Sequence, residues 1–476
     1  MPLIELLRQY KDPEVPALVF EDSMLSRSEL EHQVRDLSSR LKNAGVEPQT
    51  KVLVALPNAP AFLISFLAVN HCEAVFMPVN PGLTQEERRR IDEVARPDVV
   101  IAATGAVELL PGTYLSRTNC VPYNNDDVSD VSAIIFTSGT TGTPKGVMMT
   151  EAALLTNARA VAGYLGLSES DRTLVFLPLF YTYTLSQVLS TLVAGGSIVL
   201  LRNLFYPVLV FAAIAKHRVT GFGGVPTSLN ILANQAAASS SSQESLRYIL
   251  SAGGPLAPAM VDRVQRAFRG VAFFNNYGCT EIGPRATAID YSAYPDKIGS
   301  IGRAIPGVNV TVVRPDLSVA GAEETGEIVL SGPSLMKGYY RDAQTTASRM
   351  SLHGFHTGDY AYVDPDGFLY YQGRRDDIFK SAGEKISAKE IEDVVMEHEA
   401  VVEAAVIPLP DPNLGAVPVV YTVLRPGKSC TERELQAFCA RRLSKHKVPR
   451  AVHFVDELRK TTTGKIQKFR LKEAHQ

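Results

Sequence analysis

Apolar and polar positions follow two rhythms along the first 260 residues. Short apolar runs bounded by turn residues predict buried strands, and apolar residues three and four positions apart predict amphipathic helices. The expected strands are 51–57, 75–81, 98–103, 133–136, 173–180, 197–201 and 248–256, the last ending in a Gly–Gly turn. The expected helices are 28–44, capped by Ser28 and ended by Gly45, then 59–69, 151–165, 187–193, 211–216 and 228–235. This alternation predicts an α/β fold with a largely parallel sheet and two similar βα-layered sub-domains.

Beyond residue 300 the pattern changes twice. Short alternating strands joined by Gly, Asp and Pro turns predict a small β-barrel or meander. The last hundred residues combine helices at 391–397 and 432–443 with two strands, which predicts a compact α+β unit. The charged segment GRRDD lies between these two blocks. We therefore expect an N-terminal domain over 1–375 and a C-terminal domain over 376–476.

Composition narrows the functional classes. The chain has 476 residues, enough for two or three domains, and its net charge of −2 gives no reason to expect nucleic acid or an anionic membrane as partner. The five cysteines show no C-x-x-C spacing, so neither a zinc site nor a disulfide framework is expected, and a reducing cytoplasm fits. The N-terminus has no signal-peptide pattern, and the longest apolar runs are too short or too rich in Gly to span a bilayer.

One segment is rich in polar groups that can bind a ligand and poor in apolar residues that could build a core. Residues 134–147, IIFTSGTTGTPKGV, join an apolar strand end to a run of hydroxyls, glycines and one lysine. Uncovered backbone N–H groups, hydroxyls and a cation suit a polyphosphate. Because Pro144 stiffens the segment and apolar residues flank it, a flexible linker is the weaker interpretation. The spacing is not that of a Walker P-loop, so the segment by itself does not identify a reaction. A kinase or ATPase that uses this segment is an alternative, which release of ADP would establish.

Three further segments complete a recognisable set. They are NNYGCTEIGP (275–284), HTGDYAYVDPDGFLYYQGRRDDIFKSAGEKISAKEIE (356–392) and KTTTGKIQK (460–468). With TSGTTGTPKG, in this order and over nearly the whole chain, they resemble the adenylate-forming superfamily of acyl-CoA synthetases, luciferase-like enzymes and amino-acid-adenylating domains. The resemblance implies that a carboxylate attacks the α-phosphate of ATP to give acyl-AMP and pyrophosphate, after which a thiol displaces AMP.

The resemblance also implies which residues bind the nucleotide. Phosphate contacts are expected from Thr137, Ser138, Gly139, Thr140, Thr141, Gly142 and Lys145. Adenine and ribose contacts are expected from Gly253, Gly254, Asn276, Tyr277, Asp359 and Arg374, with Tyr277 against adenine and Asp359 on the ribose hydroxyls. Thr280 would bind the α-phosphate and Glu281 would bind Mg²⁺. Lys465 would bridge the carboxylate and the α-phosphate as negative charge accumulates. Without the family pattern, YGCTE would predict only a turn before a helix, and Lys465 a surface lysine.

In this family the small C-terminal domain takes two orientations, one for each half-reaction. The resemblance implies a hinge at Asp376 and a pantetheine entry lined by the loop around Gly383. The acceptor thiol would belong to coenzyme A or to the phosphopantetheine of a carrier protein. A carrier protein would fit secondary metabolism. The loop around Gly383 taken alone would predict a polar surface turn.

The acyl pocket is expected after the strand at 173–180. Its candidate residues are Tyr181, Tyr183, Phe222, Gly223, Val225, Ala252, Gly278 and Cys279. These are uncharged, so we expect a neutral aryl or medium-chain acyl group. Tyr181 stands where many acyl-CoA synthetases have histidine, and no Asp or Glu occurs between Arg172 and His217, which disfavours an amino acid substrate. A non-catalytic protein with a relict nucleotide site is a further alternative, and both a monomer and a homodimer remain open.

Overall fold

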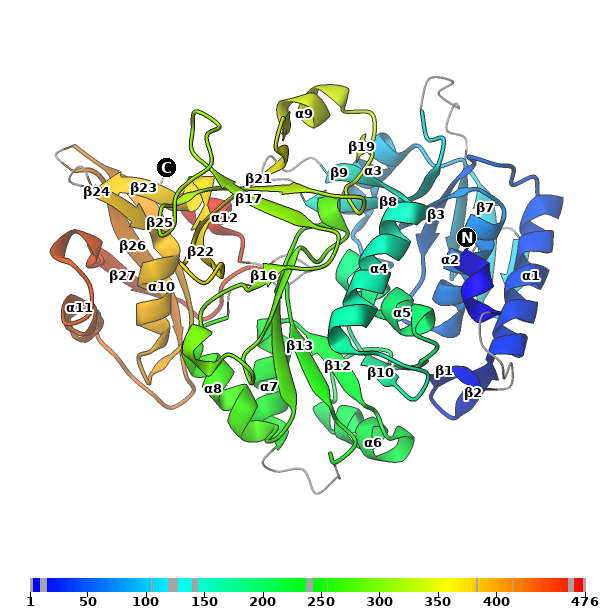
Figure 1. Ribbon diagram of the computed structural model, residues 1–476, viewed down its shortest axis with the longest axis horizontal. Helices are drawn as coiled ribbons and strands as arrows, with labels where there is room; N and C mark the ends of the chain where they lie inside the picture. Colours follow the sequence, from blue (N-terminus) through cyan, green and yellow to red (C-terminus); the bar gives the residue numbers. More distant parts are fainter. Residues whose placement is uncertain are drawn as a thin grey trace.

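The computed structural model describes residues 3–8, 15–103, 105, 107–118, 127–138, 144–236, 243–254, 256–381, 384–412, 414–460 and 466–473. Within these ranges the chain forms four β-sheets with helices packed on them (Figure 1). Three sheets are built from residues up to Arg374, and the fourth begins at Ile378. The C-terminal unit, orange and red in Figure 1, lies at one side of the rest.

An eight-stranded sheet carries the first group of expected strands. Its central strands β8, β4, β3 and β5 run parallel, joined by the helices α2 (Pro60–His71) and α3 (Gln85–Ala95). The order is β19 (Gly338–Tyr339), β9 (Pro144–Thr150), β8 (Val131–Ser138), β4 (Val75–Pro78), β3 (Lys51–Ala55), β5 (Val99–Ala102), β7 (Thr113–Arg117) and β6 (Val107–Leu110). The parallel centre confirms the α/β prediction.

A nine-stranded sheet forms the second sub-domain. The order is β16 (Arg303–Ala304), β15 (Thr287–Asp290), β14 (Ala272–Tyr277), β13 (Tyr248–Ser251), β12 (Gly221–Gly224), β10 (Arg172–Val175), β11 (Ser197–Leu200), β1 (Pro16–Phe20) and β2 (Ser23–Ser26). All neighbours from β14 to β1 pair in parallel. The N-terminal hairpin β1–β2 thus completes this second sheet, although the next strands of the chain build the first.

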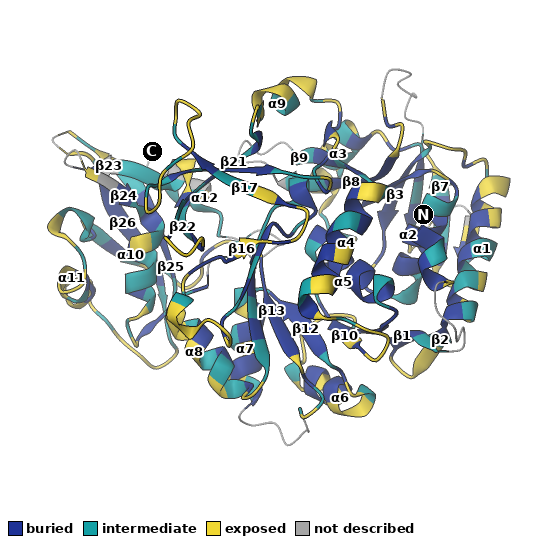
Figure 2. Ribbon diagram, in the orientation of Figure 1, coloured by how far each residue is buried: buried dark blue, intermediate teal, exposed yellow. Residues whose placement is uncertain are grey.

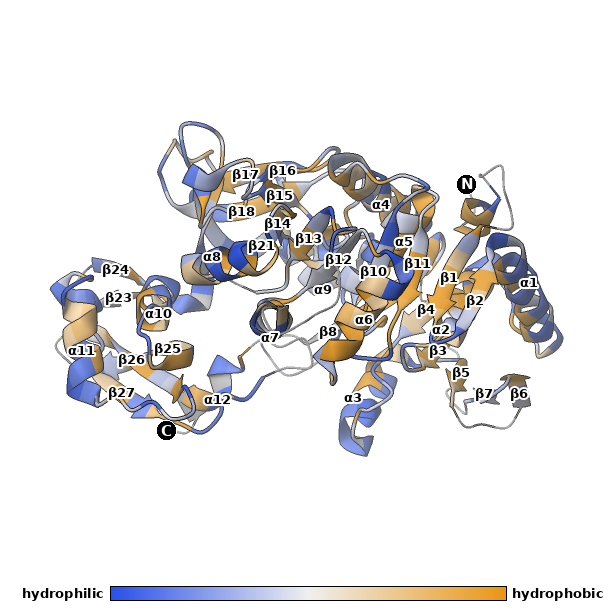
Figure 3. Ribbon diagram, turned by 90° about the horizontal axis from the view of Figure 1, so that it is seen from below, coloured by the Kyte–Doolittle hydropathy of each residue, from blue (hydrophilic) through white to orange (hydrophobic). Residues whose placement is uncertain are grey.

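Helices cover both of these sheets. They are α1 (Arg27–Asn43), α4 (Glu151–Leu165), α5 (Thr182–Val193), α6 (Pro207–His217), α7 (Pro226–Ala236) and α8 (Pro258–Ala267). Figure 2 shows β12 and β13 fully buried, while α1 and α8 have exposed outer faces. In Figure 3, β1 is hydrophobic and α1 mostly hydrophilic, as a surface helix requires. No helix in the described ranges combines the length and hydropathy that crossing a membrane requires.

The third sheet is antiparallel, and its pairing corrects one expectation. It contains β17 (Asn309–Val313), β18 (Gly326–Ser331), β21 (Gly354–Val363), β20 (Met350–Ser351) and β22 (Leu369–Arg374), with α9 (Ala343–Ser348) between β19 and β20. Among these strands, all of them described, pairing does not return from the last strand to β17. The region is therefore an open antiparallel sheet, which fits the expected meander and not the closed barrel.

The C-terminal unit is α+β, as expected. Its sheet contains β24 (Glu384–Ser387), β23 (Ile378–Ser381), β26 (Gly415–Leu424), β25 (Val401–Asp411) and β27 (Ala451–Phe454). Its helices are α10 (Ala388–Met396), α11 (Glu432–Ala440) and α12 (Lys468–Glu473). Buried residues of α10, α11 and the sheet form a separate hydrophobic core.

Two local expectations were wrong. The cap of α1 is Ser26, not Ser28, because the Ser26 hydroxyl accepts from Glu29 N and the Glu29 carboxylate accepts from Ser26 N, a reciprocal capping box. The strand expected over 173–180 ends at Val175, and α5 begins at Thr182, before the expected 187–193. The Asn58 amide binds Leu177 O at 2.9 Å and Leu179 N at 2.8 Å. These bonds hold residues 177–179 as a turn.

Candidate active site

The predicted substrate residues follow neighbouring parallel strands. Val225 follows β12, Ala252 to Gly254 follow β13, and Gly278 and Cys279 follow β14. The carboxyl ends of parallel strands meet at one edge of a sheet, which is where open α/β folds bind ligands. Gly253 has φ +86°, and a Cβ there would lie 3.4 Å from Val225. The topology thus brings these segments together.

Two paired strands, β8 and β9, flank the Gly-rich segment. β8 and β9 pair antiparallel with Phe136 opposite Gly146 and Thr137 opposite Lys145. The sequence pattern did not predict β9, because its first residues, Pro144 to Gly146, are not an apolar run. Gly139, Thr140, Thr141 and Gly142 lie outside the described residues, and of Ser138 only the backbone is described. Their phosphate contacts stay predictions.

Lys145 and Glu281 meet at one tyrosine. The Tyr339 hydroxyl donates to Glu281 Oε1 at 2.7 Å, and Lys145 Nζ lies 5.3 Å from the centre of the Tyr339 ring. Burial raises the pKa of Tyr339, so its hydroxyl stays protonated and donates. Thr182 Oγ1 lies 3.3 Å from Thr280 Oγ1. Sequence reasoning missed Tyr339 and Thr182, which no motif marks.

A second group, called here the Asp359 cluster, contains Tyr277, Asp359 and Arg374. Asp359 on β21 lies opposite Arg374 on β22 and is 5% exposed. The Tyr277 hydroxyl donates to Asp359 Oδ2 at 2.8 Å, and burial raises the pKa of Tyr277 well above its usual value. Arg374 Nε lies 3.1 Å from Oδ1 as an ion pair without hydrogen-bond geometry. Oδ1 is therefore a buried acceptor with no hydrogen bond from the described residues.

Asn276 supports this region from β14. Its Oδ1 accepts from the Tyr164 hydroxyl at 2.5 Å, and its Nδ2 donates to Ser251 O at 3.3 Å. Both ends of the amide are occupied within the protein. Asn276 thus fixes β14 against β13, and its predicted contact with the nucleotide stays a prediction.

The predicted acyl pocket is partly corrected. The Phe222 ring packs 6.0 Å from Phe176 and 5.9 Å from Phe268 in a hydrophobic core. Neighbours on a strand point to opposite faces, so Gly223 faces the other way. A Cβ on Gly223 would lie 2.7 Å from both the Gln187 amide and the Tyr183 hydroxyl. Phe222 is therefore a core residue, and Gly223 borders Tyr183.

Tyr181 and Cys279 are two of the remaining pocket candidates, and their contact with an acyl group stays a prediction. Tyr181 caps α5 and its ring lies edge-on to Phe180 at 4.4 Å. Cys279 is partly buried, and burial together with Glu281 raises the pKa of its thiol well above the usual value. A protonated thiol of this kind is a weak nucleophile. Cys279 packs against a hydrophobic core.

A charged residue missed by sequence reasoning lies beside these candidates. Arg285 is 0% exposed, and its guanidinium lies 4.8 Å from the centre of the Tyr183 ring. Its Nη1 donates to Ser186 Oγ at 2.7 Å. A Cβ on Gly278 would lie 2.8 Å from Arg285 Cα. Tyr183, Ser186, Gln187 and Arg285 are called here the Arg285 cluster. The available signal was a charged residue directly after the YGCTEIGP motif.

The residue predicted to be the hinge lies between the two parts of the molecule. The backbone of Asp376 lies in the short helix Arg375–Asp377, between β22 and β23. Lys468 Nζ lies 3.1 Å from Asp377 and 2.8 Å from Glu392. The Ser387 hydroxyl donates to Gln372 O across this junction. Gly383 and Lys465 lie outside the described residues, so their roles stay predictions.

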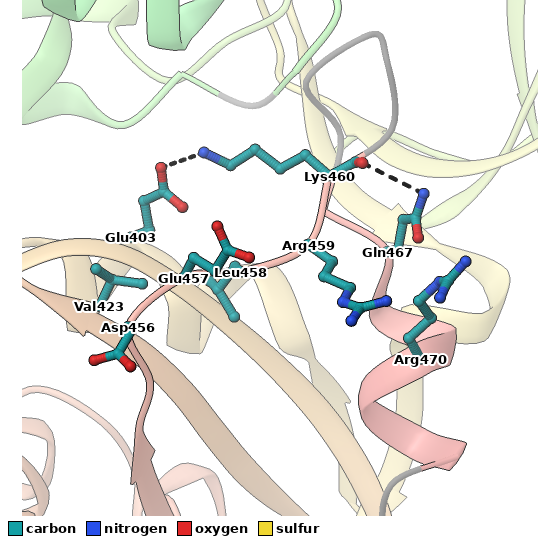
Figure 4. A pocket seen from close by; sticks show the side chains of 9 residues that line it. All are labelled: Glu403, Val423, Asp456, Glu457, Leu458, Arg459, Lys460, Gln467 and Arg470. Atoms are coloured by element: carbon teal, nitrogen blue, oxygen red, sulfur yellow. Dashed lines mark hydrogen bonds and ion pairs between the residues drawn. The ribbon is translucent and has the colours of Figure 1, made fainter. Parts of the chain in front are cut away.

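A pocket of about 550 Å³ lies beside the C-terminal motif (Figure 4). In Figure 4, Lys460 reaches across it to Glu403, and Lys460 O accepts from Gln467. The other lining residues are Val423, Asp456, Glu457, Leu458, Arg459 and Arg470. Among the described residues that line this pocket, none is a predicted site residue.

Known proteins resemble this chain over its whole length. The family model of AMP-binding enzymes matches residues 7–340, and that of their C-terminal domain matches residues 390–465. A feruloyl-CoA synthase of Amycolatopsis is 34% identical over 474 residues, covering 97% of this chain and 96% of the relative. A 2-succinylbenzoate–CoA ligase of Bacillus pumilus is 32% identical over 480 residues, covering 98% and 96%.

Solved structures agree with these sequence matches. The o-succinylbenzoate CoA synthetase of Bacillus subtilis, in complex with its acyl-adenylate intermediate, superposes with a TM-score of 0.88 at 27% identity, covering 99% of this chain and 98% of that one. The same enzyme has been solved with ATP and a magnesium ion. This chain therefore belongs to the AMP-binding enzyme family, within the adenylate-forming superfamily, and is an AMP-forming ligase of the acyl-CoA synthetase type.

Proposed function

We propose that this chain joins a carboxylic acid to the thiol of coenzyme A at the expense of ATP. In the first half-reaction a carboxylate oxygen bonds to the α-phosphorus while the bond between the α- and β-phosphates breaks, which gives acyl-AMP and pyrophosphate. In the second, the thiol sulfur bonds to the acyl carbon and AMP leaves. The relatives of known substrate are CoA ligases of feruloyl, 2-succinylbenzoyl and 4-coumaroyl groups, which supports an acid bearing an aromatic ring.

The Asp359 cluster carries this proposal. Asp359 is a buried carboxylate whose Oδ2 is oriented by Tyr277 and whose Oδ1 still lacks a donor. A buried charged acceptor without a hydrogen bond is costly, and vicinal ribose hydroxyls are donors of the right chemistry. Arg374 is half-exposed, forms an ion pair with Asp359 and can reach the ribose or a phosphate.

The phosphate side fits ATP with a magnesium ion. Glu281 supplies one hard carboxylate, and the described residues contain no cluster of three or more His, Cys, Asp or Glu. Such a site suits Mg²⁺, which takes its other ligands from phosphates and water. When bound, the ion would neutralise phosphate charge. Lys145 adds a positive charge, and Thr280 offers a hydroxyl to the α-phosphate.

The domain boundary belongs to the same proposal. Residues 1–375 would form the ATP- and acyl-binding domain, and residues 376–476 would swing about Asp376 to bring Lys465 to the site and remove it again. The charged junction formed by Lys468, Asp377 and Glu392 lies beside this hinge and supports it.

Acid-dependent exchange of labelled pyrophosphate into ATP tests the first half-reaction. Aryl, alkyl and amino acids are compared, and thioester formation is then measured with coenzyme A and with a phosphopantetheinylated carrier protein. We expect exchange with an aryl acid and a thioester on coenzyme A. A thioester on the carrier alone would favour the carrier-loading alternative. Release of ADP, or no exchange with any acid, would contradict the proposal.

A further inference from the structure

Arg285 has a buried guanidinium that the protein only partly satisfies. Its backbone oxygen accepts from Asn157 Nδ2 at 2.9 Å, and its Nη1 donates to Ser186 Oγ at 2.7 Å. The Ser186 hydroxyl in turn donates to Asn157 Oδ1 at 3.3 Å. These contacts fix the main chain and one end of the guanidinium. They therefore define which end is left for a ligand.

The opposite edge of the guanidinium is unused. Nε and Nη2 have no hydrogen-bond partner in the described part of the chain, and no carboxylate there lies within ion-pair distance. The N–H bonds of Nε and Nη2 are parallel and form the fork that matches a carboxylate. Arginine cannot lose its proton in a protein, so the buried charge needs a counter-charge.

The surroundings of this edge also lack partners. Burial raises the pKa of the Tyr183 hydroxyl, and the nearby Arg285 guanidinium opposes this rise. Neither this hydroxyl nor the polar atoms of the buried Gln187 amide make a hydrogen bond of good geometry to described residues. Gly223 allows both side chains to pack against its backbone, since a Cβ there would meet each of them at 2.7 Å. So many unmet polar groups in one place favour a polar ligand.

We infer that Arg285 binds a second carboxylate of the acid substrate, remote from the carboxylate that is activated. The inference rests on the proposed function and names its substrate class: a dicarboxylic acid of which one end becomes the thioester. A phenol or amide would offer Nε and Nη2 no charge and no matched pair of acceptor oxygens. Arg285 is thus a specificity residue, and it replaces the expectation of a neutral acyl group that the eight uncharged pocket candidates suggested.

Matched acids test the inference. Each dicarboxylic acid is paired with the analogue in which the remote carboxylate is a carboxamide, which keeps the shape and removes the charge. Pyrophosphate exchange gives kcat/KM for both, and titration calorimetry gives their Kd values. We expect the wild-type protein to prefer the dicarboxylic acid about 10²-fold, since a buried charged donor pair is then satisfied.

Arg285→Gln should bring this preference down to about 1. Arg285→Lys keeps the charge but loses the fork, so an intermediate ratio is expected. The matched control is Arg27→Gln, which alters another fully buried arginine, one that donates to Gly195 O and Gly196 O; its ratio should equal the wild-type ratio. Thermal unfolding checks each variant. If Arg285→Gln does not fold, Ser186→Ala, which removes the Nη1 acceptor, should still lower the ratio several-fold.

The outcomes separate this inference from the proposed function. A wild-type ratio near 1, or a ratio that Arg285→Gln and Ser186→Ala leave unchanged while exchange proceeds, overturns the role of Arg285 alone. No exchange with any acid overturns the proposed function and the inference with it.

Discussion

The Asp359 and Arg285 clusters both hold a charged side chain in a buried setting. Within the described residues, only Asp359 has a side chain of opposite charge beside it. Asp359 has Tyr277 on one oxygen and the Arg374 cation beside the other. Arg285 has a neutral serine at one end and no described carboxylate at the other. A side chain that binds the same ligand, ATP, in every reaction cycle can be held in place by permanent hydrogen bonds and ion pairs within the protein. A group that selects one acid must leave its binding edge open.

This difference predicts two kinds of mutational effect. Changes on the nucleotide side should lower activity with every acid by a similar factor, because ATP is common to all of them. Changes around Arg285 should alter the ratio between acids. The predictions below test that separation, from the largest expected effect to the smallest.

Lys465→Ala should lower pyrophosphate exchange by 10²-fold or more, because the lysine would neutralise charge that develops during adenylation. Thiolysis of supplied acyl-AMP should be largely retained. Lys460→Ala is the control, since Lys460 lies in the same motif but pairs with Glu403. Equal loss in both half-reactions would contradict the two-orientation mechanism.

Asp359→Asn should raise the KM for ATP by about 10- to 100-fold, because a hydrogen bond to a charged group is replaced by a neutral one and Arg374 loses its counter-charge. The factor should be the same for every acid. Asp366→Asn, an exposed change in the adjacent turn, should leave the KM near its wild-type value. A factor that depends on the acid would break the separation between the two clusters.

Gly223→Ala should lower kcat/KM for the acid by about 10-fold with little change in the KM for ATP. The new methyl group would meet Gln187 and Tyr183 at 2.7 Å, and overpacking of this kind costs about 1–3 kcal/mol. Exchange kinetics with each substrate varied in turn measure the effect. An equal change in both KM values would mean that Gly223 serves the fold and not acid binding.

Asp376→Pro should reduce thioester formation several-fold more than pyrophosphate exchange, because proline fixes φ and restricts the proposed hinge. Asp376→Ala, which leaves the backbone free to rotate, is the control and should behave like the wild type. An unchanged thioester yield in the proline variant would locate the hinge elsewhere.

Gly163→Ala should stabilise the protein by about 0.5–1 kcal/mol, because Gly163 lies exposed within α4 and its Cβ would meet nothing within 4 Å. Thermal unfolding measures this gain. The variant is also the control for Gly223→Ala, because it makes the same glycine-to-alanine change at a position that contacts neither cluster. A change in acid preference would show that α4 couples to the Arg285 cluster.

The sequence alone determined the fold class and the family, and it predicted the residues that bind the nucleotide. Strand and helix periodicity is local, so it predicted the parallel strands and helices such as Glu151–Leu165 at their observed bounds. The four motifs carry shared chemistry, so Asp359, Arg374 and Glu281 could be named from their motifs. Local pattern misled where a side chain decided the end of an element, as with Asn58 at the end of β10 and Ser26 at the start of α1.

Only the tertiary structure decided what lies beside these residues. Tyr277 and Asp359 are 82 positions apart, and Ser186 and Arg285 are 99 apart, so no window of sequence joins them. In β12, Phe222 faces the hydrophobic core and Gly223 faces Tyr183. Composition cannot show which face of the sheet each of these residues takes. A charge is recognisable in a sequence, but whether it is buried and which of its edges is unpaired depends on packing between distant elements. Arg285 therefore became a specificity residue only when the fold surrounded it.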